Sequence, residues 1–221
     1  MKFKAIIFDM DGTIIDTGDA WKKATQKLVE YHGVQYTIEM HNEINKYVIG
    51  AGLVESCRKI QEIAQIQETV ENLMHRKKII VADILHENLE FIQGFPDFHI
   101  NVKSLELKSG LATNADDNTL AIAKKVLNLE SLFGEHIYNV SHVEKPKPHP
   151  DLYLHAAKQL IEHPEQCLAV EDSAIGIAAA KAAGMFVIGI NTGGDINEVK
   201  NADLIINKYD EVNLAELIKK I

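Results

Sequence analysis

Strand-like and helical patterns alternate through most of the chain, and this alternation constrains the fold more than any other feature. Short strand-like runs recur at residues 3–8, 107–112, 136–140, 167–170, 187–190 and 204–206. Apolar residues at helical spacing lie between several of them, at residues 119–127, 150–160 and 175–183. Because strands that alternate with helices build parallel sheets, we expect an α/β fold with a doubly wound, Rossmann-like parallel sheet.

One long region interrupts the alternation. Residues 17–92 contain no convincing strand, and helical patterns cover residues 21–31, 54–64 and 70–86. An all-helical insert of this size, directly after the first strand and its turn, predicts a cap domain over a site. We therefore expect residues 1–16 and 93–221 to form an α/β core and residues 17–92 to form the helical cap.

Length, charge and cysteine content narrow the class of protein. A chain of 221 residues can bury one core, or one core and a smaller inserted domain. Its formal net charge of -9 argues against nonspecific binding to nucleic acid or to an anionic membrane. Cys57 and Cys167 have no CxxC partner, which favours free thiols in a reducing compartment. With neither a membrane-spanning apolar run nor a signal-peptide pattern, the expected location is cytoplasmic.

The segment Ile6-Ile7-Phe8-Asp9-Met10-Asp11-Gly12-Thr13 carries the first candidate site. Two residues apart on an extended chain, Asp9 and Asp11 are expected on the same side. Two adjacent carboxylates repel unless a cation or a shared proton intervenes. The pair therefore indicates a divalent metal, acid/base chemistry or both, although a plain turn after an edge strand also explains the residue types.

Three further polar features follow predicted strands. They are Thr113-Asn114, whose hydroxyl and loop amides could hold phosphate oxygens, the cation Lys145 in a proline-rich loop, and the acidic pair Glu171-Asp172. Each alone has a structural explanation: a turn, a solvated loop and a helix N-cap, respectively. In a doubly wound sheet, ligands gather at the carboxyl ends of the strands. Acids at two such ends can share one hard cation such as Mg²⁺.

Taken in this order, the motifs resemble those of the haloacid dehalogenase superfamily of phosphohydrolases. The resemblance covers almost the full chain, and it is closest to the subgroup of β-phosphoglucomutase-like enzymes and sugar-phosphate phosphatases. It implies that Asp9 is a nucleophile forming an aspartyl-phosphate and that Asp11 is the general acid/base. It also implies that Thr113, Asn114 and Lys145 bind the phosphoryl group. Mg²⁺ would be held by Asp9, Asp11, Glu171 and Asp172.

Departures from the mutase pattern favour hydrolysis. Trp21 stands where these mutases carry a histidine, and an alignment on Gly50 puts Leu53 where they carry an arginine. Asp116 and Asp117 follow the second motif, where two acids would repel a second phosphate. We expect a Mg²⁺-dependent phosphatase acting on a small phosphate monoester such as a sugar, polyol or glycolate phosphate.

Two alternatives stay open at this point. One is a β-phosphoglucomutase-type phosphomutase, and the other is a non-catalytic regulatory protein that binds phosphate. The expected partner in every case is a small phosphorylated metabolite rather than nucleic acid or membrane, bound by a monomer or weak dimer.

Overall fold

The computed structural model describes residues 2–48 and 53–220, and the chain divides into two compact units. One unit contains the segments up to Asp16 and from Leu89 onward, and the other is Thr17–Asn88. Gly50, on which the cap alignment depends, lies outside the described residues.

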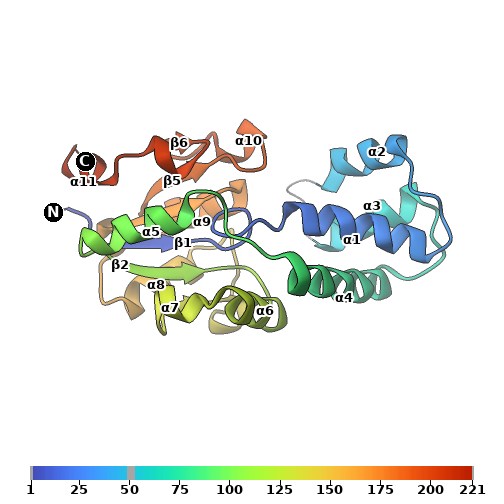
Figure 1. The fold of residues 1–221 in the computed structure, drawn as a ribbon, viewed down its shortest axis with the longest axis horizontal. Coiled ribbons are helices and arrows are strands. Elements are labelled where there is room, and N and C mark those ends of the chain that lie inside the picture. Colours follow the sequence, from blue (N-terminus) through green and yellow to red (C-terminus); the bar gives the residue numbers. More distant parts are fainter. Residues whose placement is uncertain (1, 49–52, 221) are drawn as a thin grey trace. The chain divides into compact units, whose positions relative to one another are not determined.

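The first unit is built on a six-stranded parallel sheet, which confirms the predicted fold class (Figure 1). The strand order is β3-β2-β1-β4-β5-β6, so the chain winds outward from β1 in one direction and from β4 in the other. The strand bounds are β1 (Ala5–Phe8), β2 (Lys108–Ala112), β3 (Ile137–Tyr138), β4 (Cys167–Glu171), β5 (Phe186–Ile190) and β6 (Leu204–Ile206). The order reverses between β1 and β4, which is where doubly wound sheets bind ligands.

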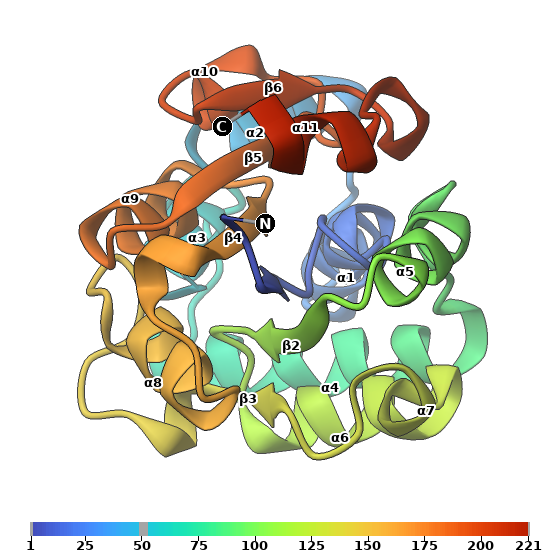
Figure 2. The same ribbon diagram turned by 90° about the vertical axis from the view of Figure 1, so that its left-hand side faces the viewer.

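Helices pack on both faces of the sheet, with α8 and α9 on one side and α5 and α7 on the other (Figure 2). The α-helices of this unit are α5 (Phe95–Ser104), α6 (Asp117–Leu127), α7 (Leu129–Phe133), α8 (Asp151–Gln159), α9 (Ala174–Ala182), α10 (Ile196–Val199) and α11 (Leu214–Lys220). Short 3₁₀ helices are η1 (Val140–His142), η2 (Pro164–Gln166) and η3 (Tyr209–Glu211).

The central strand β1 is buried on both faces, which explains its uninterrupted apolar sequence. Ala5 and Ile7 belong to the core beneath α8 and α9. Phe8 lies on the opposite face, where its ring meets Phe95 and Phe98 of α5 edge to face at centroid distances of 5.4 and 6.1 Å. Packing from both sides fixes the end of β1, and therefore the position of Asp9.

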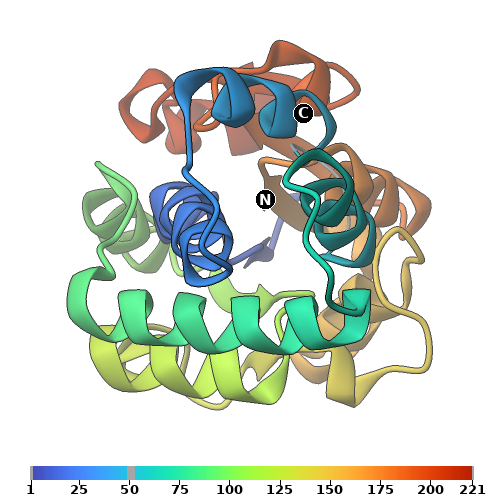
Figure 3. The same cartoon turned by 90° about the vertical axis from the view of Figure 1, so that its right-hand side faces the viewer.

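The second unit consists of helices around their own apolar core (Figure 3). Its helices are α1 (Gly18–Tyr31), α2 (Ile38–Val48), α3 (Leu53–Ile63) and α4 (Val70–Asn88). Residues 89–92, expected in the cap, pack with the sheet unit instead. The reason is backbone pairing: the Ile92 N–H donates to the Ile14 carbonyl at 2.9 Å, and Phe91 forms a bridge with Ile15.

A lysine lies inside this helical core. Lys77 of α4 is 1% exposed, and its ammonium donates to the Ser56 hydroxyl at 3.0 Å. The same ammonium lies 5.7 Å from the centre of the half-buried Trp21 ring. Burial lowers the pKa of Lys77 to about 8, despite the opposing effect of Cys57. A charged amine here is therefore costly to the fold.

Among the described residues, the structure contains no helix that is both long and apolar enough to cross a membrane.

Candidate active site

The candidate site lies where three neighbouring strands end. The register of β1 aligns Phe8 with Leu111 of β2 and with Val170 of β4. Asp9 directly follows β1, Thr113 directly follows β2, and Glu171 is the last residue of β4, so all three lie at the ends of adjacent parallel strands. The Asp9 N–H also continues the ladder by donating to the Val170 carbonyl at 3.0 Å. Parallel strand ends thus bring together residues that are far apart in the chain.

The turn after β1 depends on Gly12. This residue has a φ of 75°, and a Cβ placed on it would lie 2.1 Å from Asp172 Oδ2. Side chains from other segments hold the turn: the Thr192 hydroxyl donates to the Gly12 carbonyl at 2.6 Å, and the buried Tyr209 hydroxyl donates to the Thr13 carbonyl at 2.9 Å. Glycine is required here both for its backbone conformation and because Asp172 fills the adjacent space.

Asp9, Glu171 and Asp172 form an acidic cluster suited to a metal ion. Each offers a carboxylate oxygen, and these oxygens lie within 4.8 Å of one another. Asp11 is half-buried, and its charge raises the pKa of both Asp9 and Asp172, which places it beside the cluster. The Thr13 hydroxyl donates to Asp172 Oδ1 at 3.3 Å.

The electrostatics of this cluster also fit a cation. Burial, together with the charges of Glu171 and Asp11, raises the pKa of Asp172 to about 8. Burial raises the pKa of Asp9 as well, against the lowering effect of Lys147. Several carboxylates therefore share one ammonium, and a hard divalent ion such as Mg²⁺ would neutralise the excess negative charge.

The lysine in the site is Lys147 rather than Lys145. The prediction that Lys145 lies in the site was wrong. Lys145 is exposed, whereas Lys147 is 5% exposed. The Lys147 ammonium donates to Asp9 Oδ1 and to Glu171 Oε1, both at 2.6 Å. Burial alone would lower the pKa of Lys147, but the carboxylates of Asp9 and Glu171 outweigh it and raise the pKa. Lys147 therefore stays charged between them.

Two successive Lys-Pro pairs, Lys145-Pro146 and Lys147-Pro148, explain the misplacement. The sequence offers two equivalent lysines in a loop, and only the path of that loop decides which one points inward.

Asn114 contacts the loop that carries this lysine. Its side-chain amide donates to the Lys147 carbonyl at 3.2 Å, and its side-chain oxygen accepts the Lys147 N–H at 3.0 Å. Thr113 is buried, and its hydroxyl accepts the Ala115 N–H at 3.0 Å. The Asn114 side chain thus fixes the backbone of Lys147, a contact that the sequence did not predict.

Tyr153 of α8 is a further member of the site that the sequence analysis missed. It is fully buried, and its hydroxyl donates to Glu171 Oε1 at 2.7 Å. Tyr153 lies on the apolar face of a predicted helix, so its sequence pattern is that of an ordinary core residue.

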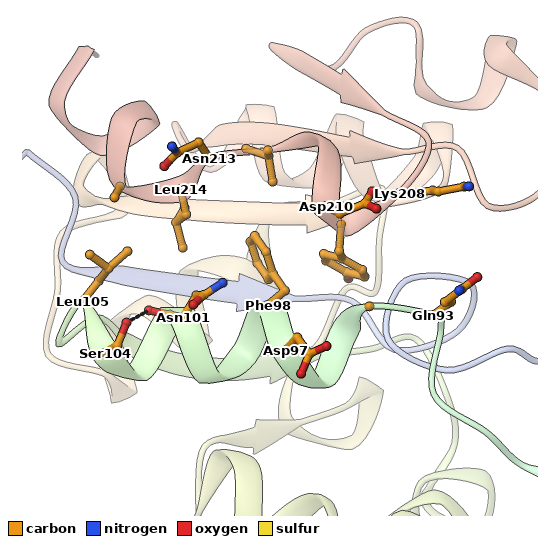
Figure 4. Close-up of a pocket in the computed structure, with 14 residues that line it drawn as sticks. Gln93, Asp97, Phe98, Asn101, Ser104, Leu105, Lys208, Asp210, Asn213 and Leu214 are labelled. Atoms are coloured by element: carbon orange, nitrogen blue, oxygen red, sulfur yellow. Dashed lines mark hydrogen bonds between the residues drawn. The ribbon is translucent and has the colours of Figure 1, made fainter.

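A cavity of about 660 Å³ lies elsewhere in this unit, between α5 and residues 208–215 (Figure 4). Phe98, Leu105 and Leu214 contribute apolar surface, and Asp97, Lys208 and Asp210 contribute charges. None of the acidic-cluster residues lines this cavity. Its location is therefore distinct from the strand ends that carry the candidate catalytic groups.

Comparison with known proteins agrees with the fold. The model of the family described as haloacid dehalogenase-like hydrolase matches residues 6–190. The chain is 29% identical to a β-phosphoglucomutase from Bacillus subtilis, over 97% of this chain and 93% of that protein. It is 31% identical to a phosphorylated carbohydrates phosphatase from Thermotoga maritima, over 82% of each.

A solved structure gives the same fold. The haloacid dehalogenase (HAD) hydrolase of family IA, variant 3, from Entamoeba histolytica superposes with a TM-score of 0.82 at 22% identity, covering 98% of each chain. The chain belongs to the haloacid dehalogenase-like hydrolase family. Relatives named as phosphatases support phosphohydrolase activity for a member of this family.

Proposed function

We propose that this protein is a Mg²⁺-dependent phosphatase that hydrolyses a small phosphate monoester through an aspartyl-phosphate on Asp9. The observation that carries the proposal is the buried ammonium of Lys147, 2.6 Å from both Asp9 and Glu171 at the end of the central strands. A nucleophilic carboxylate must remain ionised and must approach an anionic phosphoryl group. A fixed positive charge beside Asp9 serves both requirements.

In the first half-reaction, an Asp9 carboxylate oxygen forms a bond to phosphorus while the ester P–O bond breaks. Asp11 donates a proton to the departing alcohol oxygen. In the second half-reaction, Asp11 takes a proton from water as the water oxygen attacks phosphorus, which releases phosphate and restores Asp9. Splitting the transfer in this way is the general advantage of a covalent intermediate.

The remaining groups bind the phosphoryl group and offset its negative charge during transfer. Thr113 and the adjacent loop amides are suited to phosphoryl oxygens, and Lys147 offsets negative charge on Asp9 and the phosphoryl group. Asp9, Glu171 and Asp172, with the Asp11 carbonyl, would hold Mg²⁺, which supplies charge neutralisation at the phosphoryl oxygens when bound. Residues 17–88 would act as the cap that excludes bulk water.

The expected substrate carries one phosphate on a neutral sugar or polyol. Asp117 follows the Thr113 loop and accepts hydrogen bonds from Asn139 and Ser141, at 2.7 and 2.8 Å. These bonds lower the pKa of Asp117 and keep it anionic. A negative charge four residues after Thr113 would disfavour a second phosphate at this loop.

A phosphomutase is the second candidate, and the relative named β-phosphoglucomutase, matched over 97% of this chain, favours it. The two candidates differ in the fate of the phosphoryl group. A phosphatase releases inorganic phosphate from a sugar phosphate, whereas a mutase returns the phosphoryl group to another hydroxyl of the sugar.

The test is phosphate release from a panel of sugar and polyol phosphates, with Mg²⁺ and with excess chelator. We expect release that requires Mg²⁺ and that Asp9→Asn abolishes while the variant still folds. Asp97→Asn is the matched control, because Asp97 is an exposed aspartate lining the separate cavity. Turnover by Asp9→Asn, or no release by wild-type protein from any ester in the panel, would contradict the proposal.

A further inference from the structure

Tyr153 contacts both charged groups of the ion pair between Lys147 and Glu171. Its hydroxyl donates to Glu171 Oε1 at 2.7 Å and lies 3.4 Å from the Lys147 ammonium, which can donate to it. The ammonium also lies 4.8 Å from the centre of the Tyr153 ring. One side chain therefore touches Lys147 through its hydroxyl and its ring, and touches Glu171 through its proton.

The geometry makes Lys147 a shared group. Its ammonium lies 2.6 Å from Asp9 Oδ1 and 2.6 Å from Glu171 Oε1, so the two carboxylates compete for one positive charge. A hydrogen bond from Tyr153 to the Glu171 oxygen spreads part of the charge of that carboxylate onto the phenol. Glu171 then attracts the Lys147 ammonium less strongly, so the ammonium also stays bonded to Asp9.

The position of Glu171 is fixed by its surroundings, so the hydroxyl meets a defined oxygen. The Ser173 hydroxyl donates to Glu171 Oε2 at 3.1 Å, which orients the second oxygen away from Tyr153. Gly176 of α9 leaves the space for the carboxylate, since a Cβ there would lie 1.9 Å from Glu171 Oε1. Glu171 itself is fully buried, so water does not compete for these bonds.

We propose that Tyr153 is a positioning residue, whose hydroxyl holds the Lys147 ammonium in the place where it can serve Asp9 and the phosphoryl group. This inference rests on the proposed phosphatase function. Tyr153 acts through Lys147 and Glu171, and it does not touch the substrate. Its ring packs in the core beneath α8 and α9, so the competing explanation is that the residue only fills space.

Tyr153→Phe separates the two explanations because it removes the hydroxyl and keeps the ring. Tyr138→Phe is the matched control: Tyr138 is another buried tyrosine of the same core, and its hydroxyl pairs with His136 at 3.0 Å. The assay measures kcat and KM with 4-nitrophenyl phosphate at saturating Mg²⁺. Calorimetry measures the affinity for orthovanadate, whose five-coordinate form mimics a phosphoryl group in transfer.

Lys147 offsets charge that develops during transfer, so its misplacement affects kcat more than KM. For Tyr153→Phe we expect kcat to fall roughly tenfold or more, with KM within about twofold, as for loss of one hydrogen bond to a charged group. The dissociation constant for vanadate should rise by a similar factor. Tyr138→Phe should match wild type in all three quantities.

Three results would overturn the inference. The first is a Tyr153→Phe variant with wild-type kcat and vanadate affinity. The second is a variant that no longer folds while Tyr138→Phe does. The third is a fall in the number of vanadate sites at unchanged affinity, which indicates a structural role. Absence of turnover by wild-type protein would instead refute the proposed function, and the vanadate comparison would still decide the role of Tyr153.

Discussion

Replacing Lys147 with Met provides the sharpest comparison in this site, because Lys145 is a matched control two residues away in the same loop. Lys147→Met keeps the length of the side chain and removes the ammonium. The Lys147 ammonium is bonded at 2.6 Å to both Asp9 and Glu171, and its side chain is 2% exposed. Lys145 is exposed, so Lys145→Met changes a charge in solvent.

The expected size of the effect follows from burial. Removing one preorganised donor from the transition state of an enzyme costs about a hundredfold to a thousandfold in kcat. Lys147 supplies a full positive charge and holds two carboxylates, so we expect a loss of at least about a thousandfold. Breaking a buried ion pair also costs about 3–5 kcal/mol of stability. Protonation of Asp9, whose pKa burial already raises, would relieve part of that cost.

The assay measures phosphate release at saturating Mg²⁺ together with the melting temperature of each variant. Lys147→Met should be folded, less stable and nearly inactive, whereas Lys145→Met should retain wild-type kcat and melting temperature. An active Lys147→Met variant beside an inactive Lys145→Met variant would refute the assignment. It would show that the loop takes a different path from the one described.

Two further predictions concern the folding of each unit. Lys77→Met should stabilise the helical unit at pH 7, because the pKa of Lys77 is 10.5 in the unfolded chain and about 8 in the folded chain. The gain in stability over wild type is at most about 3 kcal/mol. It should shrink as the pH rises from about 8 to 10.5, since the folded wild-type chain then no longer holds a buried charge. Melting temperatures of wild type and variant against pH test this, with the exposed neighbour Lys78→Met as control, and a gap that does not change with pH would count against it. Gly176→Ala should lower stability and Mg²⁺ affinity although alanine favours helix, because its Cβ would lie 1.9 Å from Glu171 Oε1. Gly193→Ala, with nothing within 4 Å of its Cβ, is the control, and equal behaviour of the two variants in thermal unfolding and calorimetry would disprove the steric argument.

Local patterns were sufficient for the strands and for the acidic residues that follow them. Strand β1 (Ala5–Phe8) is apolar throughout because it is buried on both faces, and a glycine in the next turn marks where the strand stops. Asp9 and Asp172 follow adjacent strand ends, so the rule for ligands at parallel strand ends brought them together correctly.

The boundary of the helical unit shows where local patterns fail. Residues 89–92 continue the sequence after α4 without a distinctive signal, yet they belong to the sheet unit. Their backbone pairs with the segment around Ile14 and Ile15, more than seventy positions earlier in the chain. Such a long-range pairing leaves no periodic trace in either segment.

Sequence by itself determined the parallel α/β architecture, the helical insert and the acidic cluster at Asp9, Glu171 and Asp172. These features follow from periodicity and from the fixed geometry of strand ends, which are local properties. Only the tertiary structure decided that Lys147 rather than Lys145 meets Asp9, and that Tyr153 joins Lys147 to Glu171. The path of a loop and the choice of a helix face depend on distant packing partners, and a buried tyrosine has the same apolar spacing whether its hydroxyl serves the site or not.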